Sequence, residues 1–460
     1  MCKSMWSVIV VCVLLISLVP GPAALAKDPT PLEEALAGKF KGTTVNVKGI
    51  YDDSWGDDYR DTLKSFEDQT GIKVMYSYTD EGGDFLAGEI EAGRGPDVMD
   101  FSYLSPVRRF AKAGKIVDLA KVVDIDTLRS RYGQNWLDAA TVDSPNGPII
   151  GGLWSDFFLE SLVWYPKAAF DKAGYKVPAT WAELLALSDQ IVKDGGKPWC
   201  VENGFNGSNP GYGIANWLDN MLLRTGTAAD YEKWRNGELP ADSPQVRKAL
   251  QAIADVWFKD GYVLGGRKGI NGTTMYDVAR PMFATPTKCW LLMEGNDTLD
   301  WDQMTDYTVF KSKEYGKDYD FFVLPPMDKA SGAPLVTEGH ITTMLHDRPE
   351  VRAFMEWLTT GKQAEQWVKL GHHAGFSPNK DAQLDWYTNA RDRKLAEIAA
   401  DAQKAGNLYS NTGVSMPSSV MGAVWQALTN YVGGADLDIA LKQIDAARAA
   451  AQAPGPTATP

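Results

Sequence analysis

The chain has 460 residues, of which 44% are hydrophobic and 23% are charged, and its net charge at pH 7 is −13. These values are typical of a soluble globular protein that is too long for one hydrophobic core, so we expect two or three domains. The negative charge argues against nucleic acid or an anionic membrane surface as the main partner. A neutral solute remains compatible with this charge.

Residues 1–26 have the pattern of an export signal. Lys3 precedes an apolar block over residues 6–19, and the segment ends in the small-residue sequence ALA, which is typical of a cleavage site. A retained membrane anchor is the alternative, but the block has about 14 residues, short of the ~20 of a spanning helix. A lipid anchor at Cys12 is disfavoured because Val11 is not a small residue. We therefore expect a mature protein outside the cytoplasm, periplasmic or otherwise secreted.

The chain after the signal alternates between strand and helix patterns. β-branched runs predict strands over residues 43–49, 72–78 and 97–101. Apolar residues at helical spacing predict helices over residues 57–70 and 85–92, and residues 50–56 (IYDDSWG) are expected to form a loop. This order is typical of an α/β fold with a layered, parallel sheet.

From residue 178 onward the pattern is mostly helical. We predict helices over residues 181–194, 214–225, 243–259, 276–283, 349–359 and 362–370. Apolar strands are predicted over residues 289–293, 320–324 and 339–345. The tail 449–460 (AAAQAPGPTATP) has low complexity and is expected to be disordered.

Two cysteines, Cys200 and Cys289, remain once the signal is removed. In an exported chain they predict a disulfide, and two buried thiols are the alternative. The sequence has no P-loop, no G-x-G-x-x-G between a strand and a helix, no H-E-x-x-H and no G-x-S-x-G. We therefore expect no cofactor and no metal site. A secreted glycosidase is the rival, because its two carboxylates are recognised by their separation and not by a motif.

Aromatic residues are abundant, with 16 Trp, 18 Tyr and 16 Phe. Core packing accounts for most of them. Some are candidates for a sugar site, because the C–H face of a pyranose stacks on a flat ring while its hydroxyls need polar partners.

Several segments resemble the family 1 extracellular solute-binding proteins, which serve ABC sugar importers. The resemblance is carried by residues 95–119 (GPDVMDFSYLSPVRRFAKAGKIVDL) and 161–187 (SLVWYPKAAFDKAGYKVPATWAELLAL). Further stretches are similar to the alpha-glucoside-binding branch, namely PWC (198–200), NWLDNMLLRTG (216–226), YEKW (231–234), KCW (288–290) and MPSSVMGAVWQALTNYVGG (416–434).

The resemblance implies a two-lobe periplasmic-binding-protein-like fold of type II, whose hinge the chain crosses three times. It places the first lobe at residues 27–153 and 322–345, and the second at 154–321 and 346–448. Crossings are expected near residues 152–157, 321–326 and 344–348. The implied function is binding without catalysis. A monomer closes on an alpha-glucoside-type sugar and docks on the importer's membrane subunits, with a polyol or another small polar solute as the alternative ligand.

Ligands in open α/β folds bind at the carboxyl ends of strands. This position predicts ligand contacts for Asp53 and Trp55 and, after the third strand, for Asp100, Phe101 and Tyr103. The alternatives are a solvated turn for the first pair and a helix cap for Asp100.

The resemblance adds eight ligand-binding candidates: Trp154, Tyr212, Trp217, Asn296, Asp297, Gly339, Phe376 and Trp425. A hinge wedge is the alternative for Trp154, and a place in the core is the alternative for Trp217 and Trp425. The tryptophan that the family carries at the turn 293–297 is missing here, which leaves the stacking pattern open.

Overall fold

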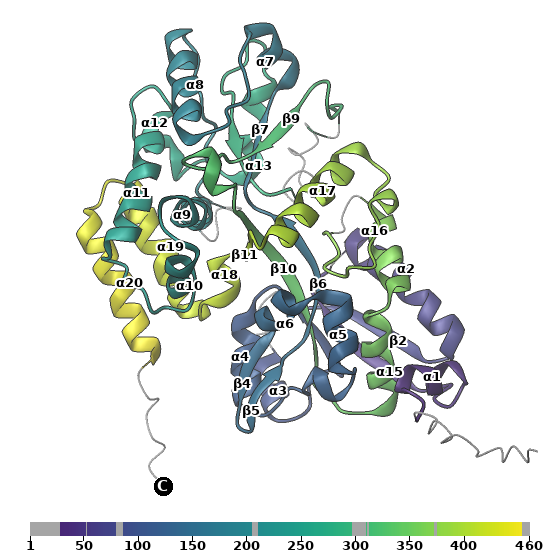
Figure 1. Cartoon of the computed structure of the whole chain (residues 1–460). Helices are drawn as coiled ribbons and strands as arrows, with labels where there is room; N and C mark the ends of the chain where they lie inside the picture. The colour runs from purple at the N-terminus through teal and green to yellow at the C-terminus, as the bar shows by residue number, and fades with distance from the viewer. Residues whose placement is uncertain are drawn as a thin grey trace, which may run out of the picture.

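The computed structural model describes residues 28–51, 53–79, 86–204, 210–296, 310, 312–371 and 375–452. The predicted export signal lies outside these residues, and so does Asp297. Two α/β lobes are visible in Figure 1, the first below and the second above. The buried hydrophobic residues of the described chain form two clusters, one centred on each lobe.

The first lobe is built on a mixed sheet. Its strands are β1 (Thr44–Gly49), β2 (Lys73–Tyr78), β3 (Val98–Phe101), β6 (Leu153–Leu159), β10 (Leu335–Met344) and β11 (Leu408–Ser410). The order is β11-β10-β3-β1-β2, and β6 also pairs with β10. The three predicted strands β1, β2 and β3 are parallel to one another, whereas β10 runs antiparallel to both β3 and β6.

Helices with one apolar face cover this sheet. In α2 (Asp53–Thr70), Tyr59, Leu63 and Phe66 recur at helical spacing and are buried. The other elements of this part are α1 (Pro31–Leu36), α3 (Ala87–Glu91), α4 (Leu104–Lys112), η2 (Leu119–Lys121), α5 (Ile125–Tyr132), α6 (Gln134–Ala139) and the hairpin of β4 (Thr141–Ser144) and β5 (Gly147–Ile150).

The second lobe has a smaller sheet and many helices. Its strands are β7 (Leu162–Tyr165), β8 (Leu292–Met293) and β9 (Asp320–Val323), in the order β8-β7-β9. Around them lie α7 (Lys167–Ala173), α8 (Trp181–Lys193), α9 (Tyr212–Thr225), α10 (Ala228–Arg235), α11 (Pro244–Trp257), α12 (Gly266–Ile270), α13 (Met275–Val278) and η3 (Arg280–Phe283). Helix α9 is buried along nearly its whole length, so it forms the centre of this lobe.

The chain after β10 returns to the first lobe before it enters the second. Helices α15 (Pro349–Leu358) and α16 (Gly361–Leu370) contact α1, β1 and α2. The expectation that the chain enters the second lobe at residue 346 is therefore wrong for this segment. The reason is that the apolar face of α15 packs on β1, which helical periodicity alone does not reveal. The remaining lobe boundaries stay predictions.

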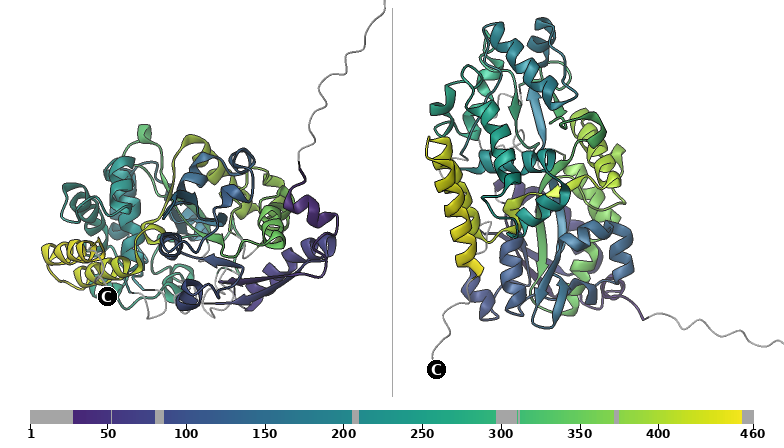
Figure 2. Two further views of the ribbon diagram at one scale, coloured as in Figure 1. Left: turned by 90° about the horizontal axis from the view of Figure 1, so that it is seen from below. Right: turned by 60° about the vertical axis from the view of Figure 1, so that its left-hand side comes forward.

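The last part of the chain leads into the second lobe. It consists of η6 (Leu384–Trp386), α17 (Ala390–Ala405), β11, α18 (Thr412–Ser415), α19 (Ser418–Val432) and α20 (Leu437–Gln452). Between β9 and β10 lies the short η5 (Lys329–Ser331). Figure 2 shows the two C-terminal helices, in yellow, along the edge of the second lobe.

Four local predictions need correction. Helix α2 begins at Asp53, inside the segment expected to be a loop. The helix expected over residues 276–283 is split into α13 and η3, because Pro281 lacks the amide hydrogen that a continuous helix needs. The strand expected over residues 289–293 is reduced to two residues. Helix α20 continues to Gln452 because alanine favours helix, so only residues 453–460 of the expected disordered tail lie outside the described chain.

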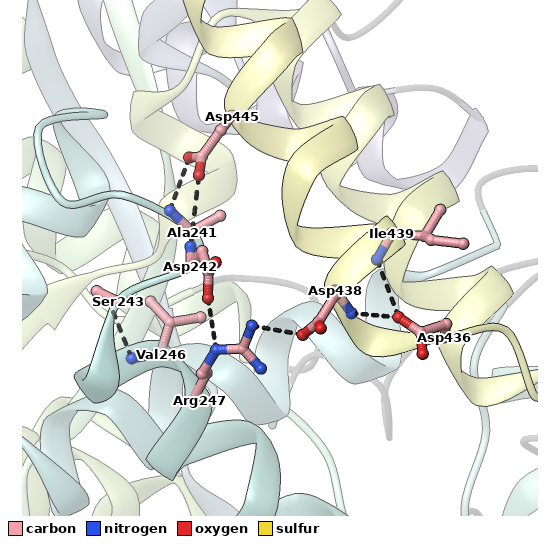
Figure 3. A network of polar contacts seen from close by, with 9 residues as sticks. All are labelled: Ala241, Asp242, Ser243, Val246, Arg247, Asp436, Asp438, Ile439 and Asp445. Atoms are coloured by element: carbon pink, nitrogen blue, oxygen red, sulfur yellow. Dashed lines mark hydrogen bonds and ion pairs between the residues drawn. The ribbon is translucent and has the colours of Figure 1, made fainter.

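Polar contacts attach helix α20 to the start of α11, as Figure 3 shows. Asp445 Oδ1 accepts a hydrogen bond from the backbone N–H of Ala241 at 2.7 Å, and Arg247 bridges Asp242 and Asp438. Further along α20, the guanidinium of Arg448 lies 4.0 Å from the centre of the Trp234 ring. The C-terminal helix is thus an integral part of the second lobe.

In the structure Cys200 and Cys289 are joined by a disulfide, with their Cα atoms 5.4 Å apart. The bond links the segment after α8 to the segment before β8. Among the described helices, none combines the length and apolar character needed to cross a bilayer.

Candidate functional site

The strands β6 and β10 run side by side between the lobes and carry the polar groups of the candidate site (Figure 1). They pair antiparallel from Leu153 to Leu159, with an irregularity between His340 and Ile341. Asp156 and Glu160 belong to the β6 segment, and Glu338 and His340 to β10. A charged group in such a buried position must be paired or hydrogen-bonded.

Asp156 is the centre of the first polar cluster, on the first-lobe side. Its carboxylate is fully buried and lies 2.8 Å from His340 Nδ1. Oδ2 accepts a hydrogen bond from the hydroxyl of Tyr51 at 3.0 Å, and Oδ1 accepts one from the His340 backbone N–H at 3.1 Å. Burial and the nearby charges of Asp156 and Asp100 raise the pKa of Tyr51 well above its usual value. This cluster ties the end of β1 to both crossing strands.

Tyr212 is the centre of the second polar cluster, on the second-lobe side. Its hydroxyl lies 3.1 Å from Glu338 Oε2 and 3.4 Å from Glu160 Oε2. Asn216 Nδ2 donates to the same oxygen of Glu160 at 3.1 Å, and Asn411 Nδ2 donates to Glu338 Oε2 at 3.0 Å. Carboxylates, amides and a phenol therefore converge where helix α9 meets the crossing strands. These are the polar groups that bind hydroxyl-rich solutes.

Gly211 brings two predicted aromatic residues together. It precedes helix α9 with a φ of +109°, and a Cβ at this position would lie 2.5 Å from the backbone oxygen of Trp425. Only glycine combines this backbone conformation with such a close approach. The start of α9, where Tyr212 follows Gly211, therefore packs against α19 at Trp425, and both aromatic residues are half-buried.

Trp55 and Tyr103 are the half-buried aromatic candidates of the first lobe. The ring centre of Trp55 lies 6.2 Å from that of Tyr51, which connects it to the first polar cluster. Tyr103 stands directly before helix α4. The side chain of Asp53 lies outside the described part of the structure. A ligand role for these residues and for Asp297 stays a prediction.

Four predicted aromatic contacts are packed in the protein interior. Phe101 is 0% exposed and packs near Phe110, while Trp217 is 3% exposed and lies edge-on to Trp199 and Trp257. A ring without accessible surface offers no face to a sugar, so this structure contradicts a stacking role for Phe101 and Trp217.

Trp154 and Phe376 are buried in the same way. Trp154 packs against Trp136, and Phe376 packs against Phe157 and Tyr387. The stacking role predicted for these two rings is also wrong. Phe101, Trp217, Trp154 and Phe376 all lie in apolar segments of the chain. A motif shows which residue type stands at each position, but not which side of the segment faces the protein interior.

Two predicted positions, Asn296 and Gly339, support the crossing strands. Asn296 Oδ1 accepts the backbone N–H of Leu159 at 2.7 Å, which fixes the end of β6. Gly339 is buried, and a Cβ there would lie 2.4 Å from the backbone oxygen of Asp156, so the close pairing of the crossing strands requires glycine. Both positions therefore have a structural role, and a ligand contact for Asn296 and Gly339 stays a prediction.

Asp100 is a buried carboxyl group inside the first lobe. Its Oδ1 accepts a hydrogen bond from Thr342 Oγ1 at 2.6 Å, while Oδ2 has no partner among the described residues. A Cβ on Gly49 would lie 2.6 Å from Oδ2, so this side chain points between strands. Burial raises its pKa to about 7. Asp100 is 1% exposed, which contradicts the predicted ligand contact.

The sequence interpretation did not select Tyr51, Asp156, Glu160 or Asn411. A usable signal was present for two of them. Asp156 and Glu160 are charged residues within the otherwise apolar segment 153–165, and such residues are retained in a strand only when a partner is available. No local pattern marks Tyr51 or Asn411, whose partners are distant in sequence.

A second acid pair lies in the second lobe. Glu202 and Glu294 are each 3% exposed, and their side chains are hydrogen-bonded to each other. Burial raises the pKa of Glu202, which also accepts the backbone N–H of Gly204 at 2.6 Å. Among the described residues, no group of three or more His, Cys, Asp or Glu side chains is arranged to hold a metal ion.

The chain matches a known protein family and two characterised binding proteins. Residues 48–365 match the family described as bacterial extracellular solute-binding protein. The chain is 30% identical over 395 residues to the osmoprotective compounds-binding protein GgtB of Synechocystis sp., covering 85% of this chain and 89% of that protein. It is 29% identical over 415 residues to the alpha-glucosides-binding periplasmic protein AglE of Rhizobium meliloti, covering 88% and 86%.

Solved structures share the fold at low sequence identity. The solute receptor AcbH, described as preferring β-D-galactopyranose, superposes with a TM-score of 0.70 at 16% identity, over 89% of this chain and 99% of that chain. Maltose-bound MalE3 of T. maritima superposes with a TM-score of 0.62 at 17% identity, over 89% and 100%. The predicted type II fold is confirmed by these structures.

Proposed function

Because the chain belongs to the bacterial extracellular solute-binding protein family, we propose that it binds an alpha-glucoside-type sugar between its two lobes. The protein is the extracytoplasmic binding component of a sugar ABC importer, and it is not an enzyme. In this proposal, the closed form, a monomer, delivers the sugar to the membrane subunits. Residues 1–26 direct export and are then removed.

The observation that carries the proposal is the second polar cluster. Tyr212, Glu160 and Glu338 meet at the crossing strands, and the neighbouring Gly211 packs against the backbone of the half-buried Trp425. Carboxylates accept hydrogen bonds from sugar hydroxyls, and an aromatic ring next to them receives the C–H face of the pyranose. The similarity to AglE supports an alpha-linked glucoside as the ligand.

Closure provides the mechanism. A ligand that contacts both lobes favours the closed arrangement by its higher affinity for that form. In the proposal, Trp55, Tyr103 and Asp53 contact it from the first lobe, and Tyr212, Trp425 and Asp297 contact it from the second. The crossing strands transmit the movement, because β6 and β10 are shared by both lobes.

A small osmoprotective solute or a polyol is the second candidate ligand. The similarity to GgtB, an osmoprotective compounds-binding protein, favours it specifically. A glucoside and a polyol are both rich in hydroxyl groups, so the same polar clusters would serve either ligand.

Calorimetric titration with the glucosides trehalose, maltose and sucrose, with free glucose, and with the polyols sorbitol and glycerol tests the proposal. We expect saturable binding of at least one alpha-glucoside, with Kd on the order of micromolar.

Replacing Tyr212 with Phe removes a hydroxyl that faces two carboxylates, and should weaken binding about tenfold. Trp425→Ala should weaken it by a similar factor through loss of the stacking face.

Matched controls separate ligand contact from general damage. Tyr175→Phe removes a hydroxyl that bonds Asp194 at the surface, and Trp386→Ala removes a ring outside the proposed site. Both should bind like the unmodified protein. Indifference to the whole panel would remove the sugar assignment, and strong binding of polyols without any glucoside would leave the second candidate.

A further inference from the structure

A cavity of about 480 Å³ reaches β6 at Phe157. Its walls are the turn between α5 and α6, the loop after residue 375 and helix α17 (Figure 1). The volume lies within the range of small-molecule sites, about 300–1,000 Å³. Tyr51, Asp156, Tyr212 and Glu338 do not line it, so it is separate from the proposed sugar site.

The floor of this cavity is aromatic. Phe157 and Phe376 have their ring centres 5.7 Å apart, and Tyr387 follows 5.8 Å from Phe376. All three rings are buried in the protein, so they form a closed apolar base and offer no open face for stacking. The apolar surface that a ligand meets is that of Leu384, which also lines the cavity and is exposed.

Two amide side chains border the floor. Asn135 and Gln403 both line the cavity, and neither side chain has a hydrogen-bond partner within the described ranges. Each amide offers two donated hydrogens and one acceptor oxygen. Together they present a polar wall that matches hydroxyl groups.

The charged residues that line the cavity are basic, whereas the whole chain has a net negative charge. Lys380 and Lys404 line it, and no Asp or Glu does, although the chain has 59 acidic and 46 basic residues. In the part of the chain that the structure describes, neither lysine has an ion-pair partner. The amine of Lys380 lies over the turn at Gly133, 3.0 Å from the position that a Cβ would take there. Two unpaired cations at one cavity attract an anion.

We propose that this cavity binds a sugar acid of the hexuronate class. The carboxylate pairs with Lys380 and Lys404, and the hydroxyls bond Asn135 and Gln403. The C–H groups of the ring lie against Leu384, which lines the cavity and is exposed. Each part of the ligand is assigned to a lining group of matching chemistry. A neutral hexose lacks the charge that the two lysines require, so the site discriminates by the carboxylate.

Titration of the full mature chain with sodium D-glucuronate tests this site. We expect saturable binding at a stoichiometry of one, and at least about tenfold weaker binding in the double variant Lys380→Gln/Lys404→Gln, because two charge-assisted contacts are lost. Lys394→Gln is the matched control. It neutralises a lysine on the same helix that pairs with Glu397 outside the cavity, and it should bind like the unmodified chain.

Two further measurements separate the cavity from the sugar site. Glucuronate binding should persist in Tyr212→Phe, and D-glucose should not displace it. All three lysines are exposed, so we expect unchanged melting temperatures that confirm intact folding. Absence of saturable binding at ~10 mM glucuronate, equal affinity of the double variant, or displacement by glucose would each overturn the proposal.

Discussion

Asp156 shows how a single residue holds the crossing together. Its carboxylate receives hydrogen bonds from Tyr51 on the first lobe and from the His340 backbone on β10. It is fully buried, so water cannot replace either partner. The residue therefore couples the end of β1 to both strands that pass between the lobes.

Removal of this carboxylate should be costly. We expect Asp156→Ala to lower the free energy of unfolding by about 3–5 kcal/mol, because the imidazole of His340 and the hydroxyl of Tyr51 lose a buried partner. Denaturation in urea, followed by tryptophan fluorescence, measures the change. Asp126→Ala is the control, since its carboxylate is exposed and pairs only with Arg129 on the same helix. A loss below about 1 kcal/mol in Asp156→Ala would contradict a structural role.

At the scale of elements, the last helix shows two kinds of attachment to the second lobe. Arg247 makes ion pairs with Asp242 and Asp438 at the surface (Figure 3). Arg448 is 5% exposed, donates to the backbone oxygens of Leu239 and Trp234, and stacks on the Trp234 ring. Burial lowers the pKa of Arg448 to about 10. Solvent screens the first set of contacts but not the second.

The two arginines should therefore differ in their contribution to stability. We expect Arg448→Ala to destabilise the fold by about 2–4 kcal/mol, because it removes buried hydrogen bonds and leaves a cavity beside Trp234. Arg247→Ala should cost less than about 1 kcal/mol. Thermal unfolding of both variants at equal protein concentration measures the difference. Equal losses would show that the surface network, and not the buried arginine, attaches α20.

At the scale of the whole molecule, burial raises the pKa of several carboxyl groups. Burial raises the pKa of Asp100 and of Asp219 to about 7, and it also raises the pKa of Glu202. In the unfolded chain such groups ionise near pH 4. Between about pH 4 and pH 7 the folded state thus binds more protons than the unfolded state. The resulting contribution to stability is fully present below pH 4 and is lost as the pH rises through 7.

We therefore expect the unfolding free energy to fall between pH 5 and pH 8. Each of these groups contributes a decrease of at most about 1.4 kcal/mol per pH unit. Asp100→Asn removes one titrating group while keeping an oxygen that accepts from Thr342, so its stability should depend less on pH than that of the unmodified chain. Urea titrations at a series of pH values measure both slopes. A stability that increases from pH 5 to pH 8 by a similar amount in both proteins would contradict this assignment.

Local patterns predicted much of the architecture. The strands near residues 44–49, 73–78 and 98–101, and the helices α8, α9, α11, α15 and α16, agree with the periodicity of the chain. The motif segments also predicted the family and the two-lobe fold, which the comparisons confirm. Periodicity and motifs are properties of residues that are close together in the chain, so they can be recognised in one sequence without a structure.

Only the tertiary structure decided which predicted residues have an accessible surface. Phe101, Trp217 and Phe376 satisfy the aromatic pattern of a sugar site, yet all three are buried. Trp217 packs against Trp257, and Phe376 packs against the distant Phe157. Tyr51 and Asn411 showed no local signal, and they join the polar clusters because the sheet brings β1 and β11 to the crossing strands. Burial and pairing depend on contacts between remote segments, whereas periodicity and motifs depend on neighbours. For this reason the sequence determined the class of protein, and the fold decided which side chains form its site.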